Sequence, residues 1–314
     1  MNPHAGAVDI SVRIGGLRLR SPVLLASGTC GYGSELAGVV NMERLGGIVT
    51  KTVTVLPRRG NPPPRVAETP SGLLNSIGLE NVGLKAFLRD KVPALSGLPA
   101  AVVVSVGGES VEEYIELVRS LARVDCAGGV ELNVSCPNVE RGMMFGSDPS
   151  LAHEVVAACR AEWARTLIVK LTPNTWDISA VARACEDAGA DAVTVANTFL
   201  GLKVDPSTRR PALSRGCGGL SGPAIRPLAV AKVWEVSRAV KIPIVGCGGI
   251  STYQDALEHI IAGASAVQVG TATFVDPGAA ESVVNGLERH CRECGVASLG
   301  ELVGSLVIGA GPLD

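Results

Sequence analysis

Chemically versatile side chains recur at the ends of short apolar runs in this sequence. Lys51 and Lys170 lie in two such runs, Asn133 and Cys136 close a third, and Asn197 closes a fourth. A lysine can neutralise an anion, a carboxamide can both donate and accept hydrogen bonds, and a thiol can act as a general base or nucleophile. Polar groups inside a protein are costly unless a ligand or a partner satisfies them, so their coincidence predicts a binding and catalytic site.

Cys136 differs from the other eight cysteines in its surroundings. It follows a predicted buried strand directly and lies between Asn133 and Asn138, whereas most buried cysteines act as small apolar residues. We therefore predict that Cys136 is a general base or nucleophile. Cys291 and Cys294 form a single C-x-x-C pair, a weak pattern for a metal, so no metal site is predicted. The four histidines fall at the terminus or in predicted helices, which argues against a histidine-based dyad.

Glycines follow the last two predicted strands. Gly248 and Gly249 come directly after the run 242–247, and Gly270 and Thr271 end the run that begins at 266. Loops at these places in a barrel often direct backbone N–H groups toward a phosphate, and glycine permits the close approach. The two glycine segments together predict a phosphate site.

These residues must be positioned by a regular alternation of strands and helices. Ser110, with Glu113 three residues later, and Asp177 mark two helix starts. Eight βα units without a break in composition predict an α/β fold, a (β/α)8 barrel with a parallel eight-stranded core, as one domain over 1–314. A doubly wound sheet is the alternative. The predicted strands are 22–26, 47–53, 100–106, 129–135, 166–171, 192–197, 242–247 and 266–270.

Two proline- or glycine-rich segments interrupt the alternation. The prolines of 57–70 exclude a helix or an interior strand and predict an extended loop, and 200–221 is predicted as a second long loop. Both follow strands, so we expect them at the C-terminal mouth of the barrel, where active sites are built.

The composition excludes several other classes. The 314 residues include 46% hydrophobic and 18% charged side chains with a net charge of -2, which argues against disorder and against an electrostatic nucleic-acid binder. No signal peptide and no run of roughly 18 apolar residues occurs, so no membrane association is expected. Nine irregularly spaced cysteines are typical of reduced thiols, and we expect a cytoplasmic protein.

Several motifs resemble those of dihydroorotate dehydrogenase. They are IVTKTVTVLPRRGNPPPRVAETPSGLLNSIGLEN, LNVSCPN, GGLSGPAIRP and VGCGGI, and the resemblance extends from about Val8 to the C-terminus. The PRRGNPPPR loop resembles the NAD-linked class 1B catalytic subunits. The resemblance implies a barrel that holds one FMN per chain and oxidises (S)-dihydroorotate to orotate in pyrimidine synthesis.

The resemblance also implies roles for individual residues. Cys136 would remove the C5 proton while hydride passes from C6 to flavin N5, and Lys170 would face the flavin N1–O2 edge. Lys51 would touch both flavin and substrate. The implied substrate-binding residues are Lys51, Asn75, Ser76, Ile77, Gly78, Leu79, Asn133, Asn138, Asn197 and Thr198. The implied cofactor-binding residues are Ala26, Ser27, Gly28, Lys51, Thr52, Ser105, Asn133, Lys170, Val195, Gly222, Gly248, Gly249, Gly270 and Thr271.

Two positions depart from the family pattern. Ser105 stands where asparagine is common, which would remove one hydrogen bond to flavin or substrate. The segment after Asn138, from Gly142 to Phe145, would be a mobile lid, and relatives more often have a second glycine beside Gly142.

The resemblance further implies an electron-transfer partner. A second subunit would carry FAD and a [2Fe–2S] cluster and pass electrons to NAD+, and a homodimer of this chain would form the core of a heterotetramer. The alternatives are a fumarate-linked class 1A enzyme and a dihydropyrimidine dehydrogenase-like flavin subunit. From a different class, Lys51 or Lys170 could form the Schiff base of a barrel aldolase.

Overall fold

The chain folds around a closed parallel barrel, seen in a computed structural model that describes residues 8–36, 38–135, 137–138 and 143–309. The hydrogen-bonded strand order is β11-β12-β17-β18-β3-β4-β7-β8, which confirms the predicted (β/α)8 barrel and rules out the doubly wound sheet. The eight barrel strands are β3 Val23–Leu25, β4 Gly47–Val49, β7 Ala101–Val106, β8 Ala127–Asn133, β11 Thr166–Lys170, β12 Ala192–Val195, β17 Ile244–Cys247 and β18 Ala266–Val269.

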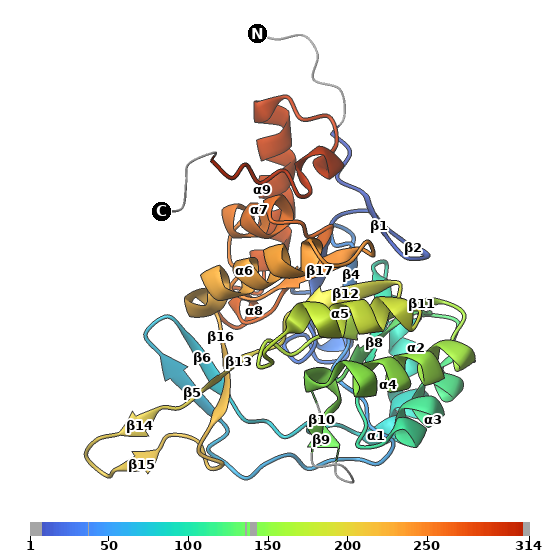
Figure 1. Cartoon of the computed structure of the whole chain (residues 1–314), viewed down its shortest axis with the longest axis vertical. Coiled ribbons are helices and arrows are strands. Elements are labelled where there is room, and N and C mark those ends of the chain that lie inside the picture. Colours follow the sequence, from blue (N-terminus) through green and yellow to red (C-terminus); the bar gives the residue numbers. More distant parts are fainter. Residues whose placement is uncertain (1–7, 37, 136, 139–142, 310–314) are drawn as a thin grey trace.

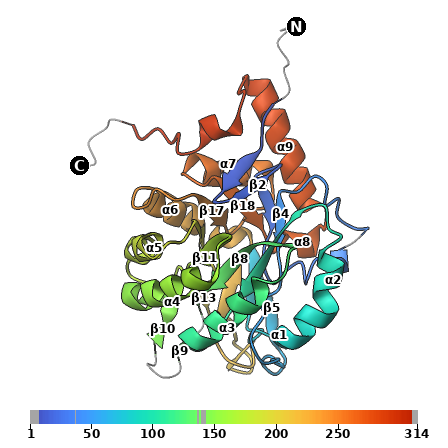
Figure 2. The same cartoon turned by 90° about the vertical axis from the view of Figure 1, so that its right-hand side faces the viewer.

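Helices surround this barrel (Figures 1 and 2). The predicted start signals are confirmed, since Ser110 accepts a hydrogen bond from the Glu113 N–H and Asp177 accepts one from the Ala180 N–H. The helices are α1 Gly83–Ala86, α2 Val92–Leu95, α3 Val111–Leu121, α4 Pro149–Glu162, α5 Ile178–Asp187, α6 Arg226–Ser237, α7 Tyr253–Ile261, α8 Ala272–Val275 and α9 Ala279–Cys294. None of the helices in the described part of the chain is long and apolar enough to cross a membrane.

An N-terminal hairpin lies at the end of the barrel opposite the mouth. Its strands are β1 Val12–Ile14 and β2 Leu17–Leu19. Ile14 and Leu19 are buried in one cluster with interior side chains of the barrel strands. Gly16 N–H donates to Thr166 Oγ1 over 3.1 Å, which fixes the hairpin to the start of β11.

The two long loops predicted at the mouth contain strands that pair with each other, which corrects the prediction of irregular loops. A four-stranded sheet has the order β13-β16-β6-β5. It joins β5 Val66–Thr69 and β6 Gly72–Asn75 to β13 Phe199–Gly201 and β16 Gly218–Ser221. The proline-rich stretch precedes β5, and β5 lies at the sheet edge, where a strand need not be flanked on both sides.

A small arm extends from this sheet. Its strands are β14 Val204–Asp205 and β15 Arg210–Pro211. Figure 1 shows the arm projecting from the mouth side, away from the barrel and the N-terminal hairpin. The four-stranded sheet lies at the mouth, where its residues Leu73, Asn75 and Ser221 line the cavity. The arm points away from the mouth (Figure 1).

Asp255 connects α6 to α7 and supplies a pH-sensitive part of the fold. Its side chain accepts from the N–H groups of Ser251 and Thr252 at 2.9 and 2.8 Å and forms an ion pair with Arg226. Burial by itself raises the pKa of Asp255, but these N–H donors, the Thr252 hydroxyl and Arg226 outweigh it. The pKa therefore lies below its ordinary value of 3.8.

Replacing Asp255 with asparagine should lower the free energy of unfolding by about 1–3 kcal/mol at neutral pH. A carboxylate with a depressed pKa stabilises the fold fully above its unfolded-state pKa, and this contribution disappears as pH falls through the lower folded value. Urea unfolding of wild type and variant at pH near 7 and near 3 measures the difference. Asp90→Asn, on the surface, is the control and should remain close to wild type. An equal destabilisation by Asp255→Asn at both pH values would contradict this account.

Candidate active site

The barrel interior is built in two layers beneath the mouth. The lower layer is apolar and includes Leu24, Val49, Val103, Ile168, Ala192, Val245 and Ala266. Side chains of a strand alternate between faces, so the residue two positions later points inward one layer higher. That upper layer contains Ala26, Lys51, Ser105, Glu131, Lys170, Thr194, Cys247 and Gln268. The interior therefore changes from apolar to polar and charged toward the C-terminal ends of the strands.

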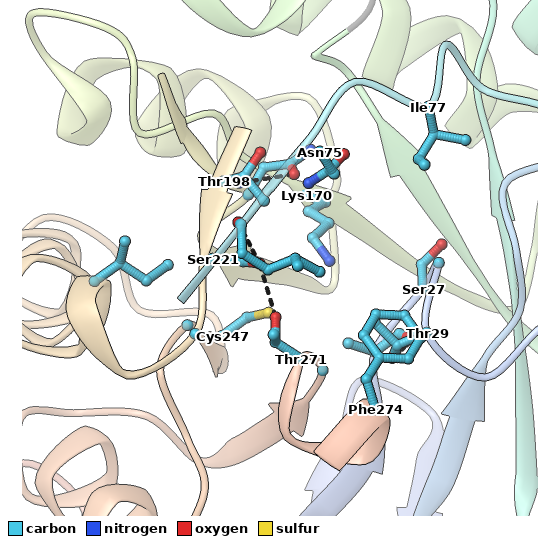
Figure 3. Close-up of a pocket in the computed structure, with 18 of the residues that line it drawn as sticks. Ser27, Thr29, Asn75, Ile77, Lys170, Thr198, Ser221, Cys247, Thr271 and Phe274 are labelled. Carbon is cyan, nitrogen blue, oxygen red and sulfur yellow. Dashed lines mark hydrogen bonds between the residues drawn. The ribbon is translucent and has the colours of Figure 1, made fainter. Parts of the chain in front are cut away.

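A cavity of about 540 Å³ opens above the polar layer. This volume lies in the range of small-molecule and cofactor sites. Most residues predicted for the site line it, and Figure 3 shows several of them around one space. The predicted residues that line the cavity are Ala26, Ser27, Gly28, Lys51, Thr52, Asn75, Ser76, Ile77, Gly78, Leu79, Asn133, Lys170, Asn197, Thr198, Gly222, Gly248, Gly249, Gly270 and Thr271.

Lys170 forms the cationic floor of the cavity. Its Nζ lies 3.2 Å from Gln268 Oε1 and 3.9 Å from Glu131 Oε1. Burial by itself lowers the pKa of Lys170, but Cys247, Glu131 and Cys30 raise it, and the net direction is above the ordinary 10.5. Burial raises the pKa of the Cys247 and Cys30 thiols, and Glu131 is the carboxylate nearest to the Lys170 ammonium group in this layer.

Carboxamide and hydroxyl groups line one wall. Asn197 Nδ2 lies 3.1 Å from Ser135 Oγ and 3.4 Å from Asn133 Oδ1, and the Thr198 N–H donates to Asn197 Oδ1 over 2.8 Å. Asn75 Nδ2 donates to the Gly219 carbonyl at 3.1 Å. This wall can offer both donors and acceptors to a planar ligand with alternating N–H and C=O groups.

A second cationic group, Lys51, lies in the cavity wall. Lys51 Nζ is 3.9 Å from Glu80 Oε2, and the same oxygen is 3.1 Å from an Arg65 guanidinium nitrogen. The Lys51 side chain is 31% exposed, so it remains available to a ligand anion. Glu80 itself lines the cavity and was not predicted.

Glycines and hydroxyls form a cradle at the start of α6. Gly249 has φ 75°, and a Cβ there would lie 2.5 Å from Arg226 Cβ and 2.6 Å from its backbone N. Thr271 Oγ1 donates to Ser221 Oγ over 2.8 Å (Figure 3). Behind the cradle, His259 Nε2 is 3.0 Å from the Gly248 carbonyl. Burial lowers the pKa of His259 to about 4, so this support is uncharged and leaves the cradle suited to a phosphate.

Replacing Gly249 with alanine should lower the free energy of unfolding by about 1–3 kcal/mol, because the residue would be strained in φ and would crowd Arg226. The variant should also lose affinity for any phosphorylated ligand of the cradle. Thermal unfolding and ligand titration measure the two effects. Gly97→Ala, where a Cβ would meet only an oxygen at 3.9 Å, is the matched control. Equal stability of the two variants would show that the turn at Gly249 tolerates a side chain.

Two predicted site residues in the described part of the chain, Ser105 and Val195, do not line the cavity. Ser105 is fully buried and hydrogen-bonds Thr52 Oγ1 at 2.9 Å, so it reaches the cavity only through Thr52. Val195 is buried, and the adjacent Ala196 lines the cavity instead. Cys136 and the predicted lid residue Gly142 lie outside the described residues. For Asn138, only the backbone is described, as part of β9 Pro137–Asn138.

Several lining residues were missed by the sequence prediction. Ser135 and Ser221 were adjacent to predicted positions, and Cys247 ends a predicted strand, so a search of strand-end neighbours would have found them. Phe274 has no such signal, although it lines the cavity (Figure 3). Among the described residues, the lining residues that were not predicted are Thr29, Val66, Leu73, Glu80, Ser135, Ala196, Ser221, Ile225, Cys247, Ile250, Ser251, Ala272 and Phe274.

Cys291, Cys294 and two of the helical histidines do not line the cavity, whereas His259 contacts the lining residue Gly248 from behind. Cys291 is buried in α9, and the exposed Cys294 lies 3.8 Å from His290 Nδ1. Within the described ranges, no group of three His, Cys, Asp or Glu side chains could hold a metal ion. His153, His259 and His290 lie in helices, as predicted.

The fold and the cavity define a (β/α)8-barrel protein with a lysine floor and a glycine cradle at the C-terminal ends of its strands. The family model for dihydroorotate dehydrogenase matches residues 9–291. The chain belongs to the dihydroorotate dehydrogenase family.

Three relatives of this family align with the chain over nearly their full length. The chain is 51% identical over 299 residues to "Dihydroorotate dehydrogenase B (NAD(+)), catalytic subunit" of Pelobacter propionicus, covering 95% of this chain and 98% of the relative. It is 48% identical over 303 residues to the protein of that name from Geotalea uraniireducens, with 96% and 99% covered. The Trichlorobacter lovleyi protein of that name is 51% identical over 298 residues, with 95% and 98% covered.

Proposed function

We propose that this chain is the catalytic subunit of an NAD+-linked dihydroorotate dehydrogenase, a single FMN-binding barrel that oxidises (S)-dihydroorotate to orotate. The observation that carries the proposal is the meeting of a buried lysine, a carboxamide wall and a glycine cradle in one cavity. The family membership and the names of the relatives support it.

The residues present fit FMN. The cradle of Gly222, Gly248 and Gly249 is packed so closely that a Cβ at any of the three would lie within 3 Å of another protein atom. Its bare backbone lines the cavity and would hold the phosphate. Lys170 would stabilise negative charge on the isoalloxazine ring near N1 and O2. When bound, FMN supplies an acceptor for the hydride that leaves C6 of the substrate.

The chain's own groups would bind the substrate and move its proton. Asn75, Asn133 and Asn197 would hold the pyrimidine edge, and Lys51 would neutralise the carboxylate. Cys136 would accept the C5 proton as its thiolate. Loss of that proton and of the C6 hydride leaves the C5=C6 double bond of orotate.

A partner subunit would complete electron transfer. We propose that it carries FAD and a [2Fe–2S] cluster, reduces NAD+ and joins a homodimer of this chain in a cytoplasmic heterotetramer. The word "NAD(+)" in the names of the relatives favours this acceptor over fumarate, and the word "Dihydroorotate" in the same names favours dihydroorotate over a dihydropyrimidine substrate.

The Schiff-base aldolase fits the cavity less well. That chemistry needs a neutral lysine, usually one whose pKa is lowered by desolvation or by another cation. The pKa of Lys170 is instead raised, with Glu131 beside it. Lys51 has a carboxylate neighbour of its own.

The test is anaerobic mixing of the FMN-loaded chain with dihydroorotate. We expect loss of the flavin's visible absorbance and formation of orotate, with dihydrouracil much slower. Addition of fumarate should not restore the absorbance, whereas NAD+ should do so only when the partner subunit is present. A chain that binds no FMN, or whose FMN dihydroorotate does not reduce, would disprove the proposed function.

A further inference from the structure

Glu131 is a buried acid that does not touch the cavity. It lies in β8 with no exposed surface and is absent from the cavity lining. Its Oε2 accepts hydrogen bonds from Gln268 Nε2 at 2.7 Å and Thr194 Oγ1 at 2.8 Å. Its Oε1 has no hydrogen-bond partner and faces Lys170 Nζ at 3.9 Å.

A buried carboxylate with an unsatisfied oxygen is costly unless an opposite charge compensates it. In the upper interior layer that charge is Lys170, which also donates to Gln268 Oε1 at 3.2 Å. Gln268 therefore donates to the acid with its amide nitrogen and accepts from the lysine with its amide oxygen. The three side chains come from β8, β18 and β11, so the closed barrel brings them together.

We propose that Glu131, with Gln268 as the connecting group, is a positioning residue that keeps Lys170 protonated and directed into the cavity. This inference concerns the charge of the cavity floor; its consequence for a flavin rests on the proposed function. Lys170 touches the ligand space, whereas Glu131 acts only through Lys170.

The alternative is that Lys170 stays protonated without help and that Glu131 merely fills the interior. The surroundings argue against it, because buried lysines without a partner have pKa values as low as about 5–6. Three described groups near Lys170 raise its pKa: Cys247, Glu131 and Cys30. The two cysteines are neutral thiols at neutral pH, because burial raises the pKa of each. Glu131 is then the one that supplies a full negative charge.

The test measures the protonation of Lys170 directly in the protein without flavin. A neutral amine reacts with formaldehyde and cyanoborohydride, whereas an ammonium does not, and peptide mass spectrometry quantifies methylation at Lys170 against Lys51 in the same sample. At pH near 8 we expect Glu131→Gln to increase the rate at Lys170 by at least about tenfold, the change in neutral fraction for one pKa unit. An unchanged rate would overturn the proposal.

Two further variants separate charge from packing. Thr194→Val removes one hydrogen bond to Glu131 but keeps both charges, and it should leave Lys170 protected. The double variant E131Q/Q268E moves the carboxylate to position 268, beside the lysine, and should restore protection. If Glu131→Gln alone does not fold, the double variant decides: a folded protein with protected Lys170 supports the proposal, and one with reactive Lys170 overturns it.

The flavin provides a second readout. In the loaded protein, loss of the Lys170 charge should shift the FMN midpoint potential downward, toward the value in Lys170→Met, because reduced flavin is anionic. If Lys170 instead keeps its charge, removing Glu131 should shift the potential upward, and that result would overturn the proposal. Should the wild type bind no FMN, the proposed function fails, whereas the methylation result still decides the role of Glu131.

Discussion

Replacing Cys136 with alanine is expected to slow reduction of bound flavin by dihydroorotate by about 10²–10⁴-fold while FMN remains bound. The proposed reaction removes a proton from C5, and alanine has no group that could accept it. The cofactor contacts proposed above come from other residues, so affinity for FMN should not change. Stopped-flow absorbance under anaerobic conditions measures the reduction rate, and a flavin titration measures the affinity.

Two matched variants make the Cys136 result specific. Cys136→Ser replaces the thiol with a hydroxyl group that can still exchange a proton, and it should retain more activity than Cys136→Ala as the pH rises. Cys294→Ala changes an exposed cysteine in α9, and the flavin bound to this variant should be reduced at the wild-type rate. A free thiol has a pKa of ~8.5, so the wild-type rate should increase with pH toward that value. If dihydroorotate reduced the flavin of Cys136→Ala at the wild-type rate, the proton transfer would have to be assigned to another group.

The barrel was predictable because its signals are local. Each barrel strand lies within or overlaps an apolar run, and the caps at Ser110 and Asp177 mark helix starts through contacts three residues apart. The sheet at the mouth was missed because its pairing is not local. Leu73 in β6 pairs with Ser221 in β16, and neither short segment has the alternating pattern that would predict a strand.

The site could be predicted only where chemistry coincides with a strand end. Lys51, Asn133 and Lys170 were found in that way. Glu131 was not, because an acid in an apolar run has meaning only when Lys170 and Gln268 are placed beside it by the closed barrel. Phe274 was missed for a related reason, since nothing in the sequence says which face of α8 meets the cavity.

Replacing Lys170 with methionine is expected to lower the free energy of unfolding of the flavin-free protein by about 3–5 kcal/mol, because it leaves the Glu131 carboxylate buried without a counter-charge. Lys51→Met is the matched control in the same cavity. Its side chain is 31% exposed and lies 3.9 Å from Glu80, and an exposed pair of this kind contributes only about 0–1 kcal/mol. Urea unfolding followed by circular dichroism measures both variants.

The double variant E131Q/K170M distinguishes the loss of the counter-charge from the loss of side-chain packing. It removes both charges at once, so it should recover a large part of the stability lost in Lys170→Met, and the two substitutions should be strongly non-additive. If methionine were costly only through its packing, the double variant would be at least as unstable as the single one. A Lys170→Met protein as stable as Lys51→Met would mean that Glu131 needs no counter-charge, and the cavity floor would then not depend on this ion pair.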